Sequence, residues 1–145
     1  MPSLDAFSPQ TRQWFESVFD EPTPAQQAAW QAISARQHTL VVAPTGSGKT
    51  LAAFLWALDR CAGQPVEADG RGATTVLYVS PLKALAVDVE RNLRAPLAGI
   101  SNAYQLQGLT PPDISVAIRT GDTPASERQR QLRRPSTILI TTPES

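Results

Sequence analysis

The sequence contains little of what disulfide frameworks and metal centres require. Its 145 residues include one cysteine, Cys61, and one histidine, His38. A single cysteine excludes an intramolecular disulfide, and no cysteine or carboxylate stands at ligand spacing from His38, so we expect neither a disulfide scaffold nor a zinc site. Cys61 is expected to be a small buried hydrophobe, and a reducing, cytoplasmic location is expected for the protein.

Long apolar runs and an excess of charge are also missing. No apolar stretch approaches the ~20 residues of a membrane span, and the N-terminal residues lack the basic and apolar regions of a secretion signal. We therefore expect no membrane association. Lysine plus arginine equals aspartate plus glutamate at 13 each, so any contact with a polyanion must come from local geometry.

The chain has the length and composition of one soluble domain, with 41% hydrophobic and 18% charged residues. Strand and helix patterns alternate along it, which predicts an α/β fold with a parallel sheet and flanking helices. Four apolar, β-branched runs predict buried strands: 39–43, 75–79, 115–118 and 137–140. Five segments predict helices: 8–19, 25–33, the run from 48 through LAAFLWALDRCA, 82–94 and 126–134.

Capping and breaking residues define several of the expected boundaries. Ser8 and Thr23 each precede a proline and are expected to cap the first two helices. The helix from residue 82 should end before Pro96, because the residue preceding a proline disfavours helical geometry. The stretch Gln64–Thr74 is expected to be a mobile connector.

A phosphate-binding pattern, APTGSGKT, occupies residues 43–50 between a predicted strand and a predicted helix. Its glycines allow positive φ, which turns backbone N–H groups toward an anion at the helix N-terminus. Lys49 would reach the β- and γ-phosphates, and the Thr50 hydroxyl would ligate Mg²⁺, so both are candidate catalytic residues. In the alternative, a ligand-free turn, Lys49 is a solvated surface residue. The candidate nucleotide-binding residues of this loop are Thr45, Gly46, Ser47, Gly48, Lys49 and Thr50.

Two features narrow the class of nucleotide-binding protein. The pattern begins with Ala43 where glycine is usual, a form common among helicases. Upstream, Phe19 followed by PTPAQQ (Pro22–Gln27) resembles the Q motif of superfamily-2 helicases. The resemblance implies that Phe19 and Gln26 belong to the nucleotide site, with the Gln26 amide bonded to the adenine edge and ATP preferred to GTP. Without the downstream loop, Gln26 would equally be an exposed glutamine at a helix start.

Three further motifs follow predicted strands: SPLKAL (80–85), RTGDT (119–123) and TTPES (141–145). Loops at the carboxyl ends of parallel strands line one rim of a sheet, where ligands bind in open α/β folds. The three motifs resemble helicase motif Ia and the next two nucleic-acid-contacting motifs of helicases. Short hydroxyls and glycine there suit contacts to a sugar-phosphate backbone. The implied contact residues are Ser80, Pro81, Leu82, Lys83, Arg119, Thr120, Gly121, Thr141, Thr142, Pro143 and Glu144.

With SPLKALAVDVERNLRAPL between them, these motifs are similar to the Lhr family of large helicase-related proteins, bacterial and archaeal 3′-to-5′ single-strand translocases. The resemblance covers nearly the whole chain. It implies that residues 1–145 are part of an N-terminal RecA-like, ATP-binding domain of a helicase acting on single-stranded DNA or RNA–DNA hybrids, with ATP and Mg²⁺ as cofactors.

The family's next motif, an Asp-Glu pair ending an apolar strand, does not occur in these residues, and neither does a second RecA-like domain with its arginine fingers. We therefore expect the chain to bind ATP-Mg²⁺ and single-stranded nucleic acid without efficient turnover, and to need the rest of its own chain for activity. Two alternatives stay open: a stand-alone, non-catalytic binding module, and a different phosphate-loop phosphotransferase such as a small kinase.

Two structural expectations complete the interpretation. The arginines at 128, 130, 133 and 134 could form a basic face near the RTGDT loop, but Asp122 and Glu127 interrupt that face, so a solvated helix face is expected. In the resembled fold the strand at 39–43 is central and pairs with strands encoded downstream. Without them it would leave an unpaired apolar edge that is prone to aggregate.

Overall fold

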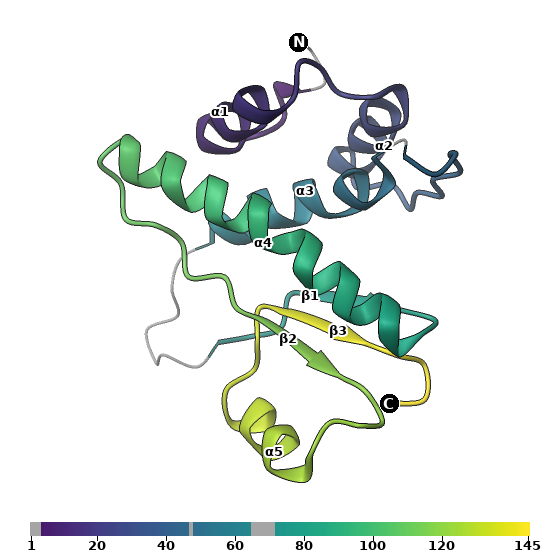
Figure 1. Cartoon of the computed structure of the whole chain (residues 1–145). Coiled ribbons are helices and arrows are strands. Elements are labelled where there is room, and N and C mark those ends of the chain that lie inside the picture. The colour runs from purple at the N-terminus through teal and green to yellow at the C-terminus, as the bar shows by residue number, and fades with distance from the viewer. Residues whose placement is uncertain (1–3, 47, 65–71) are drawn as a thin grey trace. The chain divides into compact units, whose positions relative to one another are not determined.

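The computed structural model describes residues 4–46, 48–64 and 72–145 (Figure 1). Ser47 and most of the predicted connector Gln64–Thr74 lie outside these residues. The described residues form five helices and three strands. They divide into two compact units, of which the first contains Met1–Arg60 with Pro96–Pro111 and the second contains Cys61–Ala95 with Pro112–Ser145.

The first unit is helical, and its helices begin where the capping residues predict. Ser8 caps α1 and accepts a hydrogen bond from the Thr11 amide. Thr23 caps α2 in a capping box, in which the Gln26 side chain accepts from the Thr23 amide in return. The Asp59 carboxylate accepts from the Ser8 hydroxyl at 2.6 Å. The elements are α1 (Pro9–Val18), α2 (Pro24–Ser34), α3 (Lys49–Ala62) and part of α4 (Lys83–Leu106).

Aromatic side chains form the core of the helical unit. Trp30 and Phe15 are each 1% exposed, and their ring centroids lie 5.7 Å apart in an edge-to-face arrangement. Phe7 meets Trp30 at 5.0 Å in the same geometry. Trp14 packs so closely on Gly99 that a β-carbon there would overlap its ring. These rings pack the helices together, since aromatic pairs add to the free energy of burial.

Helix α4 differs from its prediction, because it passes through Pro96 without ending. Pro96 has no N–H to donate, so one bond of the helix ladder is lost at this point. The prediction of a break there was wrong. Leu93 and Ile100, on either side of the proline, are 1% and 0% exposed, and burial of such side chains outweighs local propensity. The division between the two units falls at the same residue.

The second unit contains the sheet, with three parallel strands in the order β1-β3-β2. Ile138 and Ile140 of the central strand are both 0% exposed, as expected for a strand covered on its inner face. Helix α5 (Ala125–Arg133) confirms the helix predicted over 126–134. The strands are β1 (Val76–Val79), β2 (Val116–Arg119) and β3 (Ile138–Thr141), which confirms three of the four predicted strands. The α/β class with a parallel sheet is confirmed.

The fourth predicted strand, at 39–43, is not formed. Leu40 and Val42 are 89% and 86% exposed. A strand exists only with a hydrogen-bonded neighbour, and within the described part of the chain no strand pairs with this segment. Its apolar, β-branched composition is therefore insufficient, and its tendency to aggregate stays a prediction. Among the described helices, none is long and apolar enough to span a membrane.

Candidate nucleotide and nucleic-acid sites

The loop at 43–50 has the backbone geometry that a phosphate site needs. Gly46 and Gly48 have φ of 84° and 77°, the left-handed conformation that glycine adopts without steric cost. Helix α3 begins directly afterwards, and its first backbone bond runs from the Ala52 amide to the Gly48 carbonyl oxygen at 3.0 Å. The amides of the three residues before Ala52 thus precede the helix's own bonds, and such amides can bind an anion.

Lys49 folds back over this loop. Its ammonium donates to the Ala43 carbonyl oxygen at 2.6 Å. Ala43 does not have positive φ, because Arg36 is the only non-glycine residue of the described chain that does. The backbone at position 43 therefore does not require glycine. Lys49 and Thr50 are both solvent-exposed. A phosphate oxygen carries a full charge and would compete well with the neutral carbonyl for this ammonium.

Gln26 lies beneath the same loop. Its side chain is buried, with 4% of the residue exposed. The Oε1 atom accepts from the Thr23 amide at 3.0 Å, and Nε2 donates to the Gly48 carbonyl oxygen at 3.3 Å. Gln26 therefore has a structural role that the sequence did not indicate, because its side chain links the cap of α2 to the phosphate loop. Its predicted contact with the nucleotide stays a prediction. Contact with adenine requires the amide to share or exchange one of these partners.

Phe19, the aromatic residue of the Q motif, follows the end of α1. It is 39% exposed, and its ring lies 4.8 Å from that of Phe15 at an interplanar angle of 32°. Part of the ring therefore faces solvent while the rest packs on the aromatic core. An exposed ring face of this kind can stack on a base.

The three predicted nucleic-acid motifs emerge at one rim of the sheet, as the parallel arrangement requires. In the register, Thr141 of β3 stands opposite Val79 of β1 on one side and Arg119 of β2 on the other. The Ser80 amide continues the pairing by donating to the Thr141 carbonyl oxygen at 2.7 Å. The loops that begin at 80, 120 and 142 therefore leave the sheet at one level.

Most of the hydroxyls predicted to contact nucleic acid point into the protein. Ser80, Thr120 and Thr142 are 0%, 8% and 1% exposed. Ser80 Oγ donates to the Leu82 carbonyl oxygen at 2.9 Å, and Thr141 Oγ1 donates to the Arg119 carbonyl oxygen at 2.6 Å. These hydroxyls hold the loops together, because a buried hydroxyl without a partner is costly. They are not available to a phosphate in this structure.

The charged groups of the rim remain accessible. Lys83, at the start of α4, donates to the Asp122 carboxylate at 2.9 Å, with side-chain exposures of 48% and 77%. Arg119 is half-buried, and Gly121, Pro143 and Glu144 are exposed. Of the predicted contact residues, Lys83, Arg119 and the exposed backbone around Gly121 are therefore the groups that a polyanion could reach directly.

Arg128 is a functional candidate that the sequence prediction placed wrongly on a solvated face. Its Nη2 donates to the Thr120 carbonyl oxygen at 2.8 Å and its Nε to the Thr123 carbonyl oxygen at 3.1 Å. No other arginine of α5 does this: Arg130 pairs with Glu127, and Arg133 is exposed. The sequence signal for this contact was the nearness of Arg128 to the RTGDT motif, five residues after Thr123 and eight after Thr120.

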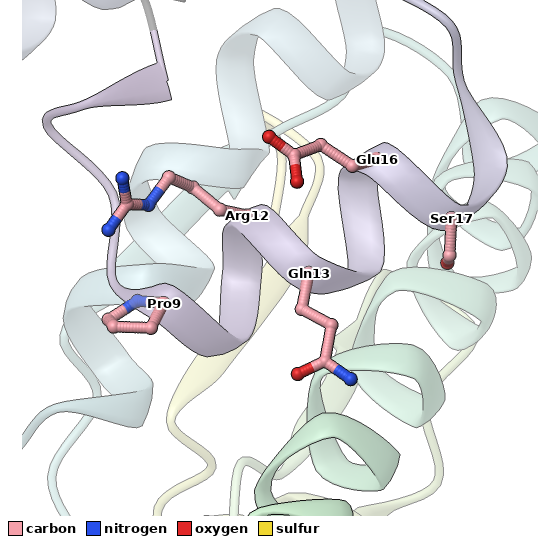
Figure 2. A pocket seen from close by; sticks show the side chains of 5 residues that line it. All are labelled: Pro9, Arg12, Gln13, Glu16 and Ser17. Atoms are coloured by element: carbon pink, nitrogen blue, oxygen red, sulfur yellow. The ribbon is translucent and has the colours of Figure 1, made fainter.

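An open hollow of about 450 Å³ lies on α1, away from the residues of the phosphate loop (Figure 2). Its lining residues all belong to that helix: Pro9, Arg12, Gln13, Glu16 and Ser17. The hollow is therefore not part of the nucleotide site.

Metal binding would depend on the phosphate loop. In the described part of the chain, no group of three or more His, Cys, Asp or Glu residues could hold a metal ion. The Thr50 hydroxyl, together with phosphate oxygens of a bound nucleotide, would fit Mg²⁺.

Known proteins resemble this chain over almost its whole length. A family model described as DEAD/DEAH box helicase matches residues 23–145. The Lhr helicase/probable uracil glycosylase of Mycolicibacterium smegmatis is 59% identical over 142 residues, which are 98% of this chain and 9% of that protein. The Lhr helicase/uracil glycosylase of Escherichia coli (strain K12) is 52% identical over 145 residues, 97% of this chain and 9% of that protein.

A solved structure gives the same result in three dimensions. The structure of Mycobacterium smegmatis helicase Lhr bound to ssDNA and AMP-PNP has a TM-score of 0.90 and 58% identity, and the match covers 98% of this chain and 18% of that one. The chain thus spans about a tenth of the length of the curated bacterial relatives described above. The resemblance to Lhr helicases that the motifs indicate is confirmed.

Proposed function

Because the chain belongs to the DEAD/DEAH box helicase family, we propose that it is the ATP-binding part of an ATP-dependent helicase or translocase. Its proposed ligands are ATP with Mg²⁺ and nucleic acid, either single-stranded DNA or an RNA–DNA hybrid. The proposed location is the cytoplasm. The relative of known structure was bound to ssDNA and AMP-PNP, which supports both ligand classes. We also propose that ATP hydrolysis and translocation require the rest of the helicase, including a second RecA-like domain.

The proposed nucleotide site lies in the helical unit. Backbone amides at the start of α3 and the Lys49 ammonium hold the phosphates, while Thr50 offers its hydroxyl to the metal ion and Gln26 reads the adenine edge. Mg²⁺, when bound, neutralises charge on the β- and γ-phosphate oxygens. The positive φ of Gly46 and Gly48 directly ahead of α3 is the observation that carries this proposal, since it turns the loop's amides as an anion site requires.

The proposed nucleic-acid site lies on the rim of the sheet in the other unit. Lys83 and Arg119 supply positive charge there, and the exposed backbone at Gly121 permits close approach of a phosphate. Contacts to phosphate and sugar position a strand without reading its sequence, which suits a motor that acts on any sequence.

The two lysines of the chain allow a reciprocal experiment. Lys49→Ala should abolish binding of a fluorescent AMP-PNP analogue with Mg²⁺ and leave binding of a labelled oligo(dT) unchanged. Lys83→Ala should weaken oligo(dT) binding by about 3- to 10-fold at low salt and leave the nucleotide affinity unchanged. Unchanged nucleotide binding by Lys49→Ala, under conditions where the protein stays folded, would contradict the nucleotide site.

The two alternative functions predict different outcomes. A stand-alone binding module would show no turnover even when the 145 residues replace the matched residues of Mycolicibacterium smegmatis Lhr, whereas a helicase segment should restore ssDNA-stimulated ATP hydrolysis in that chimaera. ATP hydrolysis by the purified 145-residue chain, abolished by Lys49→Ala, would exclude the non-catalytic module directly. Transfer of phosphate to a small acceptor, with no effect of ssDNA on nucleotide affinity, would favour a kinase.

A further inference from the structure

We propose that Arg128 is a positioning residue for nucleic-acid binding, which sets the conformation of the RTGDT turn (119–123). The inference rests on the proposed function of the sheet rim. Its basis is the two-pronged contact of the guanidinium with the turn: Nη2 donates to the Thr120 carbonyl oxygen and Nε to the Thr123 carbonyl oxygen, at 2.8 and 3.1 Å. Arg128 thus holds both ends of the turn at once.

The turn is built so that this contact matters. The Thr120 carbonyl oxygen also accepts from the Thr123 amide at 3.1 Å, and the Thr123 hydroxyl accepts from the Thr120 amide at 2.9 Å. Gly121 and Asp122 lie between these bonds and are exposed. Because Arg119 is the first residue of the RTGDT turn, the conformation of the turn decides where the charge of Arg119 and the exposed backbone at Gly121 lie on the rim.

A second side chain of α5 also binds this part of the chain and fixes the orientation of the helix against the turn. Gln131, one helical turn after Arg128, donates from Nε2 to the Ile118 carbonyl oxygen at 3.1 Å. Residues three apart lie on the same helix face, so α5 is bonded both to the end of β2 and to the turn beyond it. Rigid support of this kind lowers the entropy cost of binding a strand at the turn.

The chemistry of arginine explains the residue type. Its planar guanidinium presents several donors in a fixed geometry, whereas a lysine ammonium is a single point charge on a flexible stem. Among the described residues no carboxylate pairs with Arg128, whose acceptors are both neutral carbonyl oxygens. Arg128→Lys therefore keeps the charge and loses the fork, which separates positioning from a contribution of positive field.

The experiment compares four proteins: the unchanged chain, Arg128→Lys, Arg128→Gln and Arg133→Gln. Arg133 lies on the same helix and is exposed, so its substitution removes a charge without touching the turn. Binding of a labelled oligo(dT) is measured by fluorescence anisotropy, and amide hydrogen exchange at Thr123 is measured by NMR. Thermal unfolding is recorded for each protein.

Both Arg128 variants should weaken oligo(dT) binding by about 3- to 10-fold and speed exchange at the Thr123 amide about 10-fold, while Arg133→Gln changes each by less than about 2-fold. Unchanged binding by Arg128→Lys would overturn the proposal in favour of a purely electrostatic role. Lower thermal stability with unchanged binding and exchange would overturn it in favour of a purely structural one.

Arg119→Gln distinguishes this inference from the function on which it rests. If Arg119→Gln weakens binding and the Arg128 variants do not, the rim binds nucleic acid and the positioning role is wrong. If the unchanged chain binds no oligo(dT), both as it stands and in the Mycolicibacterium smegmatis Lhr chimaera, the rim interface is wrong and the positioning role is overturned with it.

Discussion

The ammonium of Lys83 lies 2.9 Å from the carboxylate of Asp122, which joins the first residue of α4 to the turn after β2. The two residues are 39 positions apart in the chain and come from two different motifs that are predicted to contact nucleic acid. In the protein alone, the carboxylate thus occupies the position on Lys83 that a phosphate oxygen would take. The pair is exposed, so its own contribution to stability is small.

Removing the carboxylate should free Lys83 for a phosphate. We expect Asp122→Asn to raise the affinity for oligo(dT) by about 2- to 5-fold at low salt, and the gain should shrink as salt screens both interactions. Anisotropy titrations at several salt concentrations measure this. Asp113→Asn is the control, because it removes an exposed carboxylate of the same unit that forms no ion pair in the described chain. A lower affinity of Asp122→Asn would mean that Asp122 orients Lys83 and does not compete for it.

The two glycines of the phosphate loop should differ in their tolerance of alanine. Both have positive φ, but a β-carbon at Gly46 meets open space, whereas one at Gly48 would overlap the Gln26 amide. We expect Gly46→Ala to lower the free energy of unfolding by about 1 kcal/mol and Gly48→Ala by roughly 2–3 kcal/mol, since the bond from Gln26 is lost as well. Urea unfolding of both variants gives the comparison. Equal losses would show that Gln26 moves aside without cost.

Substitutions at Gln26 should separate its two bonds. Gln26→Glu keeps an acceptor for the Thr23 amide and loses the donor to Gly48, so the cap of α2 survives while the loop loses its support. We expect the affinity for ATP to fall about 10-fold and the preference for ATP over GTP to disappear. Titration with both nucleotides measures this, and Gln31→Glu, the same change at an exposed site on α2 outside the Q motif, serves as the control. Retained ATP preference would exclude Gln26 as the adenine contact.

The close packing of Gly99 on Trp14 should make that position intolerant of any side chain. A methyl group at 99 would push the indole of Trp14 out of the aromatic core, and overpacking of this kind costs about 1–3 kcal/mol. We expect Gly99→Ala to lower the free energy of unfolding by that amount and to change the near-ultraviolet circular dichroism of the tryptophans. Asn102→Ala, at an exposed site on the same helix, should have little effect. Unchanged stability of Gly99→Ala would show that α4 and α1 separate easily.

Local sequence signals predicted those parts of the fold that form through neighbouring residues. Ser8 and Thr23 cap their helices because a side-chain oxygen and a nearby amide suffice. The same holds for the glycines of the phosphate loop. The predictions at Pro96 and at 39–43 failed for the same reason, because tertiary neighbours and not local sequence decide both segments. Buried neighbours carry α4 through a helix-breaking proline, and the absence of a paired neighbour among the described residues leaves an apolar run without a strand.

The sequence by itself determined that this protein carries the pattern of a phosphate-binding loop, that three motifs follow parallel strands at one rim, and that it resembles the Lhr helicases. Each of these follows from residue types at short spacing. Only the tertiary structure decided which groups of the rim face solvent. Ser80 and Thr142 turn inward, Lys83 meets Asp122, and Arg128 reaches the RTGDT turn. These contacts depend on the register of β1 and β2 against β3, which brings together residues dozens of positions apart.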